Sequence, residues 1–138
     1  MEKAWCSTCK QYLPVSEFHK DAGRKNGLSA RCKKCVHQRD LSAYGRYKSY
    51  RRNAKHRNID FQMTFEEFEN IIKKPCAYCG AKANPYNGID RKDNSIGYKE
   101  DNLIPCCEWC NRIKLTYTEA QMKEHIKKMY SYLFDKNE

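Results

Sequence analysis

Apolar residues recur with helical spacing in two segments of the chain, and each segment begins with a capping box. In the first, residues 64–67 read Thr-Phe-Glu-Glu, which places Thr at the N-cap and Glu at N3. The apolar positions that follow share one helical face: Phe65, Phe68, Ile71 and Ile72. Pro75 stops the run just after Lys73. This pattern predicts a short core helix.

The second segment lies near the end of the sequence and begins Thr-Glu-Ala-Gln at 118–121. Its apolar positions again follow helical spacing: Met122, Ile126, Met129, Tyr130 and Leu133. We expect this last helix to pack across the unit that precedes it, with a dimer contact as the alternative use of the stripe.

Residues 40–58 combine a helical pattern with strong positive charge. Tyr44, Tyr47 and Tyr50 recur every third residue, so they line one helical face. The basic residues around them are Arg46, Lys48, Arg51, Arg52, Lys55 and Arg57. We predict that these side chains bind DNA phosphates, while the tyrosines pack on a neighbouring module or on sugar edges. A solvated helix that only connects two modules is the alternative.

Charge is divided unevenly along the 138 residues. Residues 1–58 hold 15 Lys and Arg against 4 acids, a balance of +11, whereas residues 59–138 hold 12 against 13, a balance of −1. The basic part is therefore expected to meet a polyanion, and the rest to serve another purpose. Because no apolar run has the length of a membrane span or a signal peptide, we expect a soluble chain that is not exported.

Eight of the nine cysteines form four Cys-x-x-Cys pairs. In a chain with 40% hydrophobic residues and a mean hydropathy of −0.99, such pairs favour structural zinc in a reducing, cytoplasmic compartment. The ligands predicted for the first zinc ion are Cys6, Cys9, Cys32 and Cys35. Those predicted for the second are Cys76, Cys79, Cys107 and Cys110. Cys106 is the one cysteine that belongs to no pair. Because it adjoins Cys107, its use as a zinc ligand in place of a neighbour stays open.

The second set of cysteines encloses the most distinctive stretch, residues 76–114. Its two pairs bracket a segment that can form two strands, and the second pair runs directly into a helix. Asp90 follows the apolar Ile89 on the first of these strands, where a purely structural strand would need no acid. A zinc-held helix beside a strand with one carboxylate is the layout of a small metal-dependent nuclease site.

This stretch resembles the HNH endonuclease family, whose ββα-metal motif reads Cys-x-x-Cys, Asp-His, Asn and then Cys-x-x-Cys-His/Asn-x-x-Lys. The positions that match in order are Asp90, Asn102, Cys107, Cys110, Asn111 and Lys114. Arg91 departs from the motif, because it stands where the family has a histidine. The resemblance covers residues 75–116, and the second zinc module ahead of the site resembles small two-zinc members of the family, such as restriction enzymes and phage-type nucleases.

The resemblance implies different roles for the metal ions and for the residues of the site. Both zinc ions would be structural, and a separate catalytic divalent cation, Mg²⁺, would be held by oxygens of Asp90 and Asn111. Asn102 would hold the loop between the strands through backbone hydrogen bonds. Arg91 cannot be a general base because a guanidinium stays protonated, but it can stabilise negative charge on a phosphate.

The base or nucleophile must then come from elsewhere. Tyr78 stands between two zinc ligands, and a restriction enzyme of the family combines an Asp-Arg sequence with an active-site tyrosine thought to start cleavage. His56 is the second candidate, because it is the histidine on the basic helix. Packing against the zinc site is the alternative role for Tyr78, and a plain surface position is the alternative for His56.

We therefore predict a small zinc-stapled α+β protein in three parts. These are a zinc-ribbon-like Cys₄ module (1–39), a basic helix with a short connecting helix (40–74), and an HNH-like ββα-metal motif with the second zinc and the last helix (75–138). The predicted activity is metal-dependent hydrolysis of phosphodiester bonds in double-stranded DNA, for restriction, homing or phage DNA processing.

The predicted partner is DNA, with a homodimer on DNA left open and with neither a membrane nor a small-molecule substrate. The first alternative is a non-catalytic zinc-stapled protein that binds nucleic acid with the same fold. A nuclease directed at RNA is a less favoured third interpretation.

Overall fold

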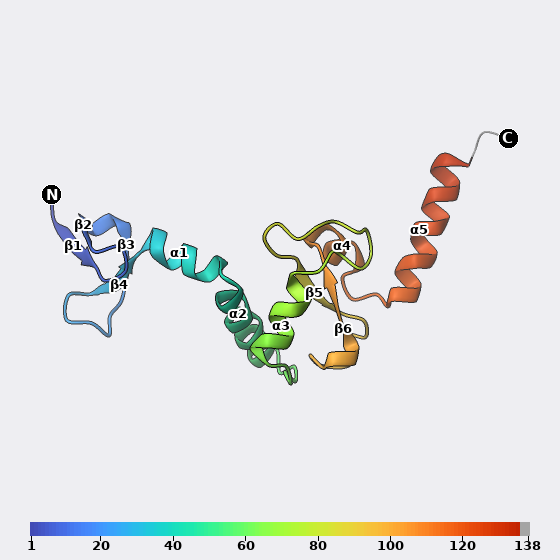
Figure 1. Ribbon diagram of the computed structural model, residues 1–138, viewed down its shortest axis with the longest axis horizontal. Helices are drawn as coiled ribbons and strands as arrows, with labels where there is room; N and C mark the ends of the chain where they lie inside the picture. The colour runs from blue at the N-terminus through green and yellow to red at the C-terminus, as the bar shows by residue number, and fades with distance from the viewer. Residues whose placement is uncertain (136–138) are drawn as a thin grey trace. The chain divides into compact units, whose positions relative to one another are not determined.

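The computed structural model describes residues 1–135 and has the predicted α+β architecture (Figure 1). The described residues form three two-stranded antiparallel sheets and five α-helices. Internal contacts divide the chain into two compact units, Met1–Ser49 and the part from Tyr50 onward. Each unit contains one cluster of four cysteines. Among residues 1–135, no helix is long and apolar enough to cross a lipid bilayer.

The first unit begins with two antiparallel hairpins joined by a single 3-10 turn, η1 (Val15–Glu17). The four strands are β1 (Lys3–Cys6), β2 (Gln11–Pro14), β3 (Phe18–Lys20) and β4 (Leu28–Cys32). The buried core consists of Cys6, Phe18, Cys32 and Cys35. Because cysteines make up most of this core, we expect the unit to depend on bound metal rather than on apolar burial.

Two helices follow, α1 (Lys33–Leu41) and α2 (Ala43–His56). They are separated at Ser42, whose hydroxyl donates to the Arg39 carbonyl oxygen and accepts the Gly45 N–H. Gly45 is required at this junction because a Cβ there would lie 2.2 Å from the Arg39 carbonyl oxygen. The basic helix predicted within 40–58 is therefore present as α2, whereas α1 is an element that the apolar pattern did not predict.

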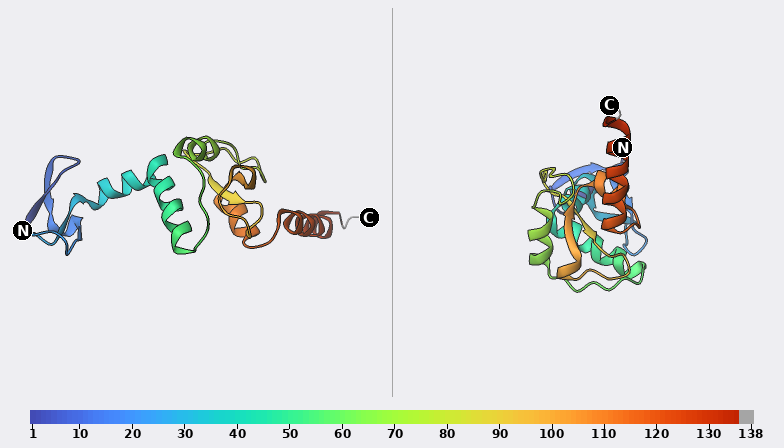
Figure 2. Two further views of the ribbon diagram at one scale, coloured as in Figure 1. Left: turned by 90° about the horizontal axis from the view of Figure 1, so that it is seen from below. Right: turned by 90° about the vertical axis from the view of Figure 1, so that its right-hand side faces the viewer.

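The second unit places a hairpin against a short helix. The strands β5 (Gly88–Arg91) and β6 (Leu103–Cys106) pair antiparallel, with η2 (Glu100–Asn102) between them, and α4 (Glu108–Lys114) follows at once. The yellow β5 and the orange α4 lie side by side in Figures 1 and 2, and a buried ion pair joins them. This is the predicted strand–strand–helix order.

The core of the second unit is centred on α3 (Phe65–Ile72). The predicted capping box at Thr64 is confirmed, and both Phe68 and Ile72 are fully buried. The Tyr50 ring packs edge-on against Phe68, with 5.2 Å between ring centroids, and its hydroxyl accepts the Ile89 N–H at 3.1 Å. Tyr50 therefore belongs to this core, and the predicted packing of the tyrosine face on the zinc module or on sugar edges is wrong for it.

The last helix, α5 (Glu119–Phe134), begins with the second predicted capping box, which is confirmed at Thr118. Its apolar stripe does not pack across the unit as expected. Met122 is the one buried residue of this helix, whereas Ile126, Met129 and Leu133 are 46%, 49% and 60% exposed. The difference arises because local periodicity identifies an apolar face but does not say what covers it.

Candidate active site

Both predicted sets of cysteines converge in the structure. In each set the four Sγ atoms lie within 4.8 Å of one another. A tetrahedral zinc site with Zn–S bonds of about 2.3 Å requires Sγ–Sγ separations of about 3.8 Å. Cys79 and Cys107, from the two pairs of the second cluster, have Sγ atoms 3.7 Å apart. Each cluster could therefore hold one structural zinc ion, which gives two ions per chain.

Backbone N–H groups favour thiolates at both clusters. The hydrogen bond from the Cys32 N–H to Cys6 Sγ, at 3.3 Å, does most to lower the pKa of Cys6 to about 6. Burial acts to raise the pKa of Cys76, but hydrogen bonds from neighbouring backbone groups outweigh it and lower the pKa to about 6. Burial raises the pKa of Cys106 to about 12, but a hydrogen bond to Cys32 raises the pKa of the clustered Cys35 as far, so Cys106 is distinguished by its position outside the cluster. Cys107, not Cys106, is the clustered thiol.

The hairpin carries Asp90 to the interface between β5 and α4, where the residue is 4% exposed. Both carboxylate oxygens have protein partners. Lys114 Nζ lies 3.2 Å from Oδ1, and the Tyr78 hydroxyl donates to Oδ2 at 2.7 Å. Because a carboxylate has about four lone-pair sites, each oxygen keeps capacity for one further ligand.

Lys114 is fully buried at the end of α4. Besides the ion pair with Asp90, its Nζ donates to the Arg91 carbonyl oxygen at 2.9 Å, so one ammonium holds both a side chain and the backbone of β5. The carboxylate and the carbonyl replace the water that the ammonium loses on burial. Sequence reasoning matched Lys114 to the family motif but gave it no role, since a lysine in the last turn of a helix is ordinarily exposed.

Arg91, the residue in place of the family histidine, is 8% exposed. Its Nη1 donates to the carbonyl oxygens of Asn94 and Ile96, at 3.0 and 2.9 Å. The guanidinium carbon also lies 5.4 Å from the centroid of the Tyr98 ring, within the range of a cation–π contact. Arg91 therefore holds the loop that follows β5, a role that the sequence did not indicate.

Asn102 holds the same loop from its other end, as predicted. Its Oδ1 accepts the Asp93 N–H at 2.9 Å, and its Nδ2 donates to the carbonyl oxygens of Asp93, Ile96 and Gly97. The residue is 6% exposed, so these bonds replace water that the amide has lost. The loop between β5 and β6 is thus fixed by two buried side chains.

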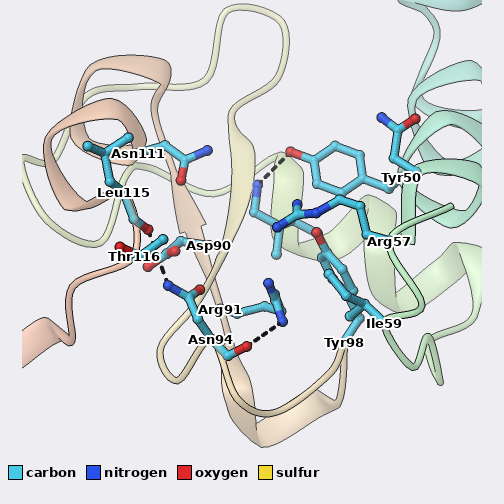
Figure 3. A pocket seen from close by; sticks show the side chains of 12 residues that line it. Tyr50, Arg57, Ile59, Asp90, Arg91, Asn94, Tyr98, Asn111, Leu115 and Thr116 are labelled. Atoms are coloured by element: carbon cyan, nitrogen blue, oxygen red, sulfur yellow. Dashed lines mark hydrogen bonds between the residues drawn. The ribbon is translucent and has the colours of Figure 1, made fainter. Parts of the chain in front are cut away.

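Asp90 and Arg91 border a cavity of about 520 Å³ within the second unit (Figure 3). Its walls come from α2 and the turn after it, from β5 and the following loop, and from α4 and its end. The polar residues that line it are Asn53, Arg57, Asp90, Arg91, Asn94 and Asn111. A wall of amide, carboxylate and guanidinium groups suits a phosphate and a cation better than an apolar ligand.

The predicted site residues are only partly brought together. Asp90, Arg91, Asn111 and Arg57 line the cavity, whereas His56 is exposed at the end of α2 and is not part of its wall. Tyr78 also lies outside the wall and reaches the site through Asp90. Burial, and after it the hydrogen bond to Asp90, raises the pKa of Tyr78 well above its usual range.

Two asparagines of the cavity wall, Asn53 and Asn94, were not predicted from the sequence as site residues. Asn53 lies on α2 among basic residues, and only the packing of α2 beside β5 gives it a place in the cavity. Asn94 follows the motif residues of β5, and its Nδ2 donates to the Leu115 carbonyl oxygen at 3.2 Å. Neither position carried a motif, so no signal in a single sequence marks them.

The basic residues predicted to bind DNA differ in exposure. Arg51, Arg52 and Lys55 are exposed along α2, and Arg57 follows its end. Lys48 is exposed, with Nζ 5.7 Å from the centroid of the Tyr44 ring, and Arg46 is half-buried. The exposed residues are free to meet phosphates, while Arg46 also contributes to packing.

The donor set of the cavity fits one hard divalent cation. Asp90 supplies a carboxylate, and Asn111 on α4 supplies an exposed carboxamide to the same cavity. Among the described residues, groups of three or more clustered His, Cys, Asp or Glu ligands occur only at the two Cys₄ sets. A cation in the cavity would therefore have one protein carboxylate, with water or a phosphate completing its oxygen shell.

No family model matches the chain, but two curated proteins are similar to part of it. An uncharacterised protein of Acanthamoeba polyphaga mimivirus is 42% identical over 74 residues, and an uncharacterised 29.0 kDa protein of Enterobacteria phage T4 is 33% identical over 78 residues. These matches cover 53% and 52% of this chain but only 13% and 32% of the relatives.

A solved structure, that of the rare-cutting HNH restriction endonuclease PacI, is similar over 93% of this chain and 96% of its own, at 22% identity and a TM-score of 0.49. Within this chain, the motif residues lie in order on a strand–strand–helix unit that is stapled by a Cys₄ cluster. In the order of these residues and in this geometry, the chain resembles the HNH endonucleases.

Proposed function

We propose that the protein is a metal-dependent endonuclease of the HNH type that hydrolyses phosphodiester bonds in double-stranded DNA. One observation supports this most directly. A buried carboxylate, Asp90, lines a cavity whose other polar groups are cationic or neutral. A surface that only binds DNA gains nothing from an acid facing phosphate, whereas a nuclease needs one to hold its cation.

Asp90 and Asn111 would hold Mg²⁺, which when bound neutralises charge on the scissile phosphate and on the leaving oxygen. Lys114 and the Tyr78 hydroxyl keep the Asp90 carboxylate in one orientation, since each bonds one of its oxygens. A carboxylate held in this way needs no rearrangement when the cation arrives.

Two arginines of the cavity wall, Arg57 and Arg91, would bind the phosphate. Arg57 is exposed at the edge of the cavity, and Arg91 uses only Nη1 in its hydrogen bonds to the loop. Nη2 and Nε of Arg91 then remain to donate to a phosphate oxygen. The exposed basic residues of α2 would extend this contact to neighbouring phosphates.

The geometry favours a positioning role for Tyr78, because its hydroxyl donates to Asp90 and lies outside the cavity wall. His56, which lies outside the cavity wall at the end of α2, would then activate water. Two variants separate these roles. With Tyr78 as a positioning residue, Tyr78→Phe should cleave at saturating Mg²⁺ but need more of it, and His56→Ala should be inactive. A Tyr78→Phe variant that is inactive at every Mg²⁺ concentration would make the tyrosine the nucleophile.

The test of the proposal is cleavage of supercoiled plasmid with and without Mg²⁺. Asp90→Asn should slow cleavage by more than about 100-fold, the scale expected when one group that stabilises the transition state is lost. Asn is preferable to Ala here because it keeps the shape of the side chain beside Lys114. Asp101→Asn is the matched control, since Asp101 is an exposed acid on η2 outside the cavity. Equal rates for Asp90→Asn and the parent would refute the assignment.

A second candidate function is non-catalytic binding of nucleic acid. It is favoured by the same contacts of Asp90, since a carboxylate bonded to Lys114 and Tyr78 has a structural role whether or not a cation binds. For such a protein, no divalent cation supports cleavage of plasmid, and Asp90→Asn binds duplex DNA as the parent does. A parallel assay on structured RNA distinguishes an RNA-directed nuclease from one that cuts DNA.

A further inference from the structure

The C-terminal helix α5 presents an apolar face that the rest of the second unit does not cover. The exposed members of this face are Ile126, Met129, Tyr130 and Leu133, at 46%, 49%, 59% and 60% exposure. A 16-residue helix with most of its apolar stripe exposed is unusual for a monomer, because contiguous apolar patches on soluble proteins mark interaction sites.

The spacing of the stripe is that of a helix-pairing seam. Met122, Ile126, Met129 and Leu133 are separated by four, three and four residues, the alternation of a and d positions in a coiled coil. At the start of α5 the seam continues into an apolar groove of about 330 Å³. Ile113 and Tyr117, which are 54% and 58% exposed, form its other wall.

We propose that α5 and this groove bind α5 of a second copy of the same chain. The net charge of α5 argues against DNA as the partner of this face. From Glu119 to Asp135, three lysines balance three acids, so the segment is neutral within a chain of net charge +10. The affinity of proteins for nucleic acid comes mainly from positive charge, which this helix lacks.

The size of the face also suits a dimer. Seven apolar side chains contribute: Ile113, Tyr117, Ile126, Met129, Tyr130, Leu133 and Phe134. At about half exposure each they offer roughly 100 Å² apiece, hence roughly 700 Å² per chain. A stable specific interface buries about 800 Å² per partner. Because such interfaces range from about 600 to 1,000 Å² per partner, this face falls within the range when nearly all of it is covered.

A dimer would also complete the chemistry, and this step rests on the proposed nuclease function. One chain has one cavity with one Asp90 carboxylate, so it serves one phosphodiester bond at a time. Cutting both strands of a duplex requires two such cavities or two encounters. Pairing through α5 joins two cavities in one particle, so that both strands are cut in a single binding event.

The test compares two lysine substitutions on the same helix, by sedimentation equilibrium of the zinc-loaded, full-length chain. Met129→Lys places a charge in the seam, whereas Ser131→Lys places the same charge on the opposite face, two residues away. The parent and Ser131→Lys should sediment at twice the chain mass of 16.4 kDa. Met129→Lys should dimerise at least about tenfold more weakly, a difference of 1.4 kcal/mol.

Circular dichroism establishes that both variants keep α5, since lysine is a good helix former at either position. A parent that sediments as a monomer overturns the proposal, and the face then serves a different protein or a further segment of a longer chain. Equal dimerisation of the two variants also overturns it.

Plasmid cleavage then tests the step that depends on nuclease activity. The parent should linearise the plasmid directly, whereas Met129→Lys should accumulate the nicked form. If no variant cuts DNA, the proposed function fails while sedimentation still decides the interface. Direct linearisation by a monomeric Met129→Lys would refute the link between pairing and the second cut.

Discussion

Removing one partner of the ion pair between Lys114 and Asp90 should be one of the most destabilising single changes in the second unit. Both side chains are removed from water, at 0% and 4% exposure, and their atoms are 3.2 Å apart. Lys114→Met keeps the length of the buried stem but removes the ammonium. Asp90 would then be a buried carboxylate with one remaining partner, the Tyr78 hydroxyl.

The expected cost of this change follows from what is left behind. Breaking a buried ion pair by removing one partner costs about 3–5 kcal/mol, because the other charge stays buried without compensation. That is a large part of a typical free energy of unfolding of about 5–15 kcal/mol. Removing both charges in Lys114→Met/Asp90→Asn leaves no orphan charge, so the double variant should be more stable than Lys114→Met alone.

An exposed ion pair of similar length supplies the control. Glu124 and Lys128 on α5 are 2.9 Å apart, but both side chains are more than two-thirds exposed. Lys128→Met should therefore cost no more than about 0.5 kcal/mol. Burial, rather than distance, is the variable that separates the two pairs.

Urea unfolding at fixed free zinc, followed by circular dichroism, measures five proteins: the parent, Lys114→Met, Asp90→Asn, the double variant and Lys128→Met. Zinc must be held constant because bound metal adds to the apparent stability. The reasoning is refuted if Lys114→Met costs less than about 1 kcal/mol, or if the double variant is destabilised by the sum of the two single effects. Either result would mean that water or a rearranged side chain compensates the charge of Asp90.

Three further predictions concern the metal, the DNA and the hairpin. Metal analysis should find two zinc ions per chain, held by the two Cys₄ sets, and one ion in a fully folded protein would contradict this. Reversing the charge of Arg51 and Arg52 should lower the slope of log affinity against log salt by about 0.9 for each phosphate that the protein no longer neutralises. An unchanged slope would mean that DNA does not contact this part of α2. Gly88→Ala should cost about 1–3 kcal/mol, because its Cβ would lie 2.9 Å from the Tyr50 hydroxyl oxygen and 3.2 Å from the Cys106 carbonyl oxygen. The same cost in a Tyr50→Phe background would show that the hydroxyl is not the obstacle.

The features that could be predicted from the sequence are those encoded over a few residues. The capping boxes at Thr64 and Thr118 depend on positions three residues apart, and both form as expected. The Cys-x-x-Cys pairs are equally local, and metal chemistry leaves few ways to combine them. Asn102 was placed correctly because its motif position implied a loop with unpaired backbone groups.

The features that escaped prediction depend on interactions between distant residues. Tyr50 and Ile89 are 39 residues apart, and nothing local in either segment indicates that the hydroxyl of one meets the N–H of the other. Lys114 is buried because β5 brings a carboxylate and a carbonyl to it, and neither is visible in the sequence of α4. The exposure of α5 is a third case, since its stripe has the same pattern as a core helix.

The arginine in place of the family histidine has a structural explanation that bears on the chemistry. Arg91 Nη1 and Asn102 Nδ2 both donate to the Ile96 carbonyl oxygen, so the two residues hold the loop after β5 at one shared point. That loop carries Asn94 and Tyr98 into the cavity wall. A histidine on β5 is shorter and could not donate to two carbonyls of this loop from one nitrogen. The exchange therefore gives up a base on the strand and gains a fixed wall, so in the proposed nuclease the group that activates water would come from outside β5.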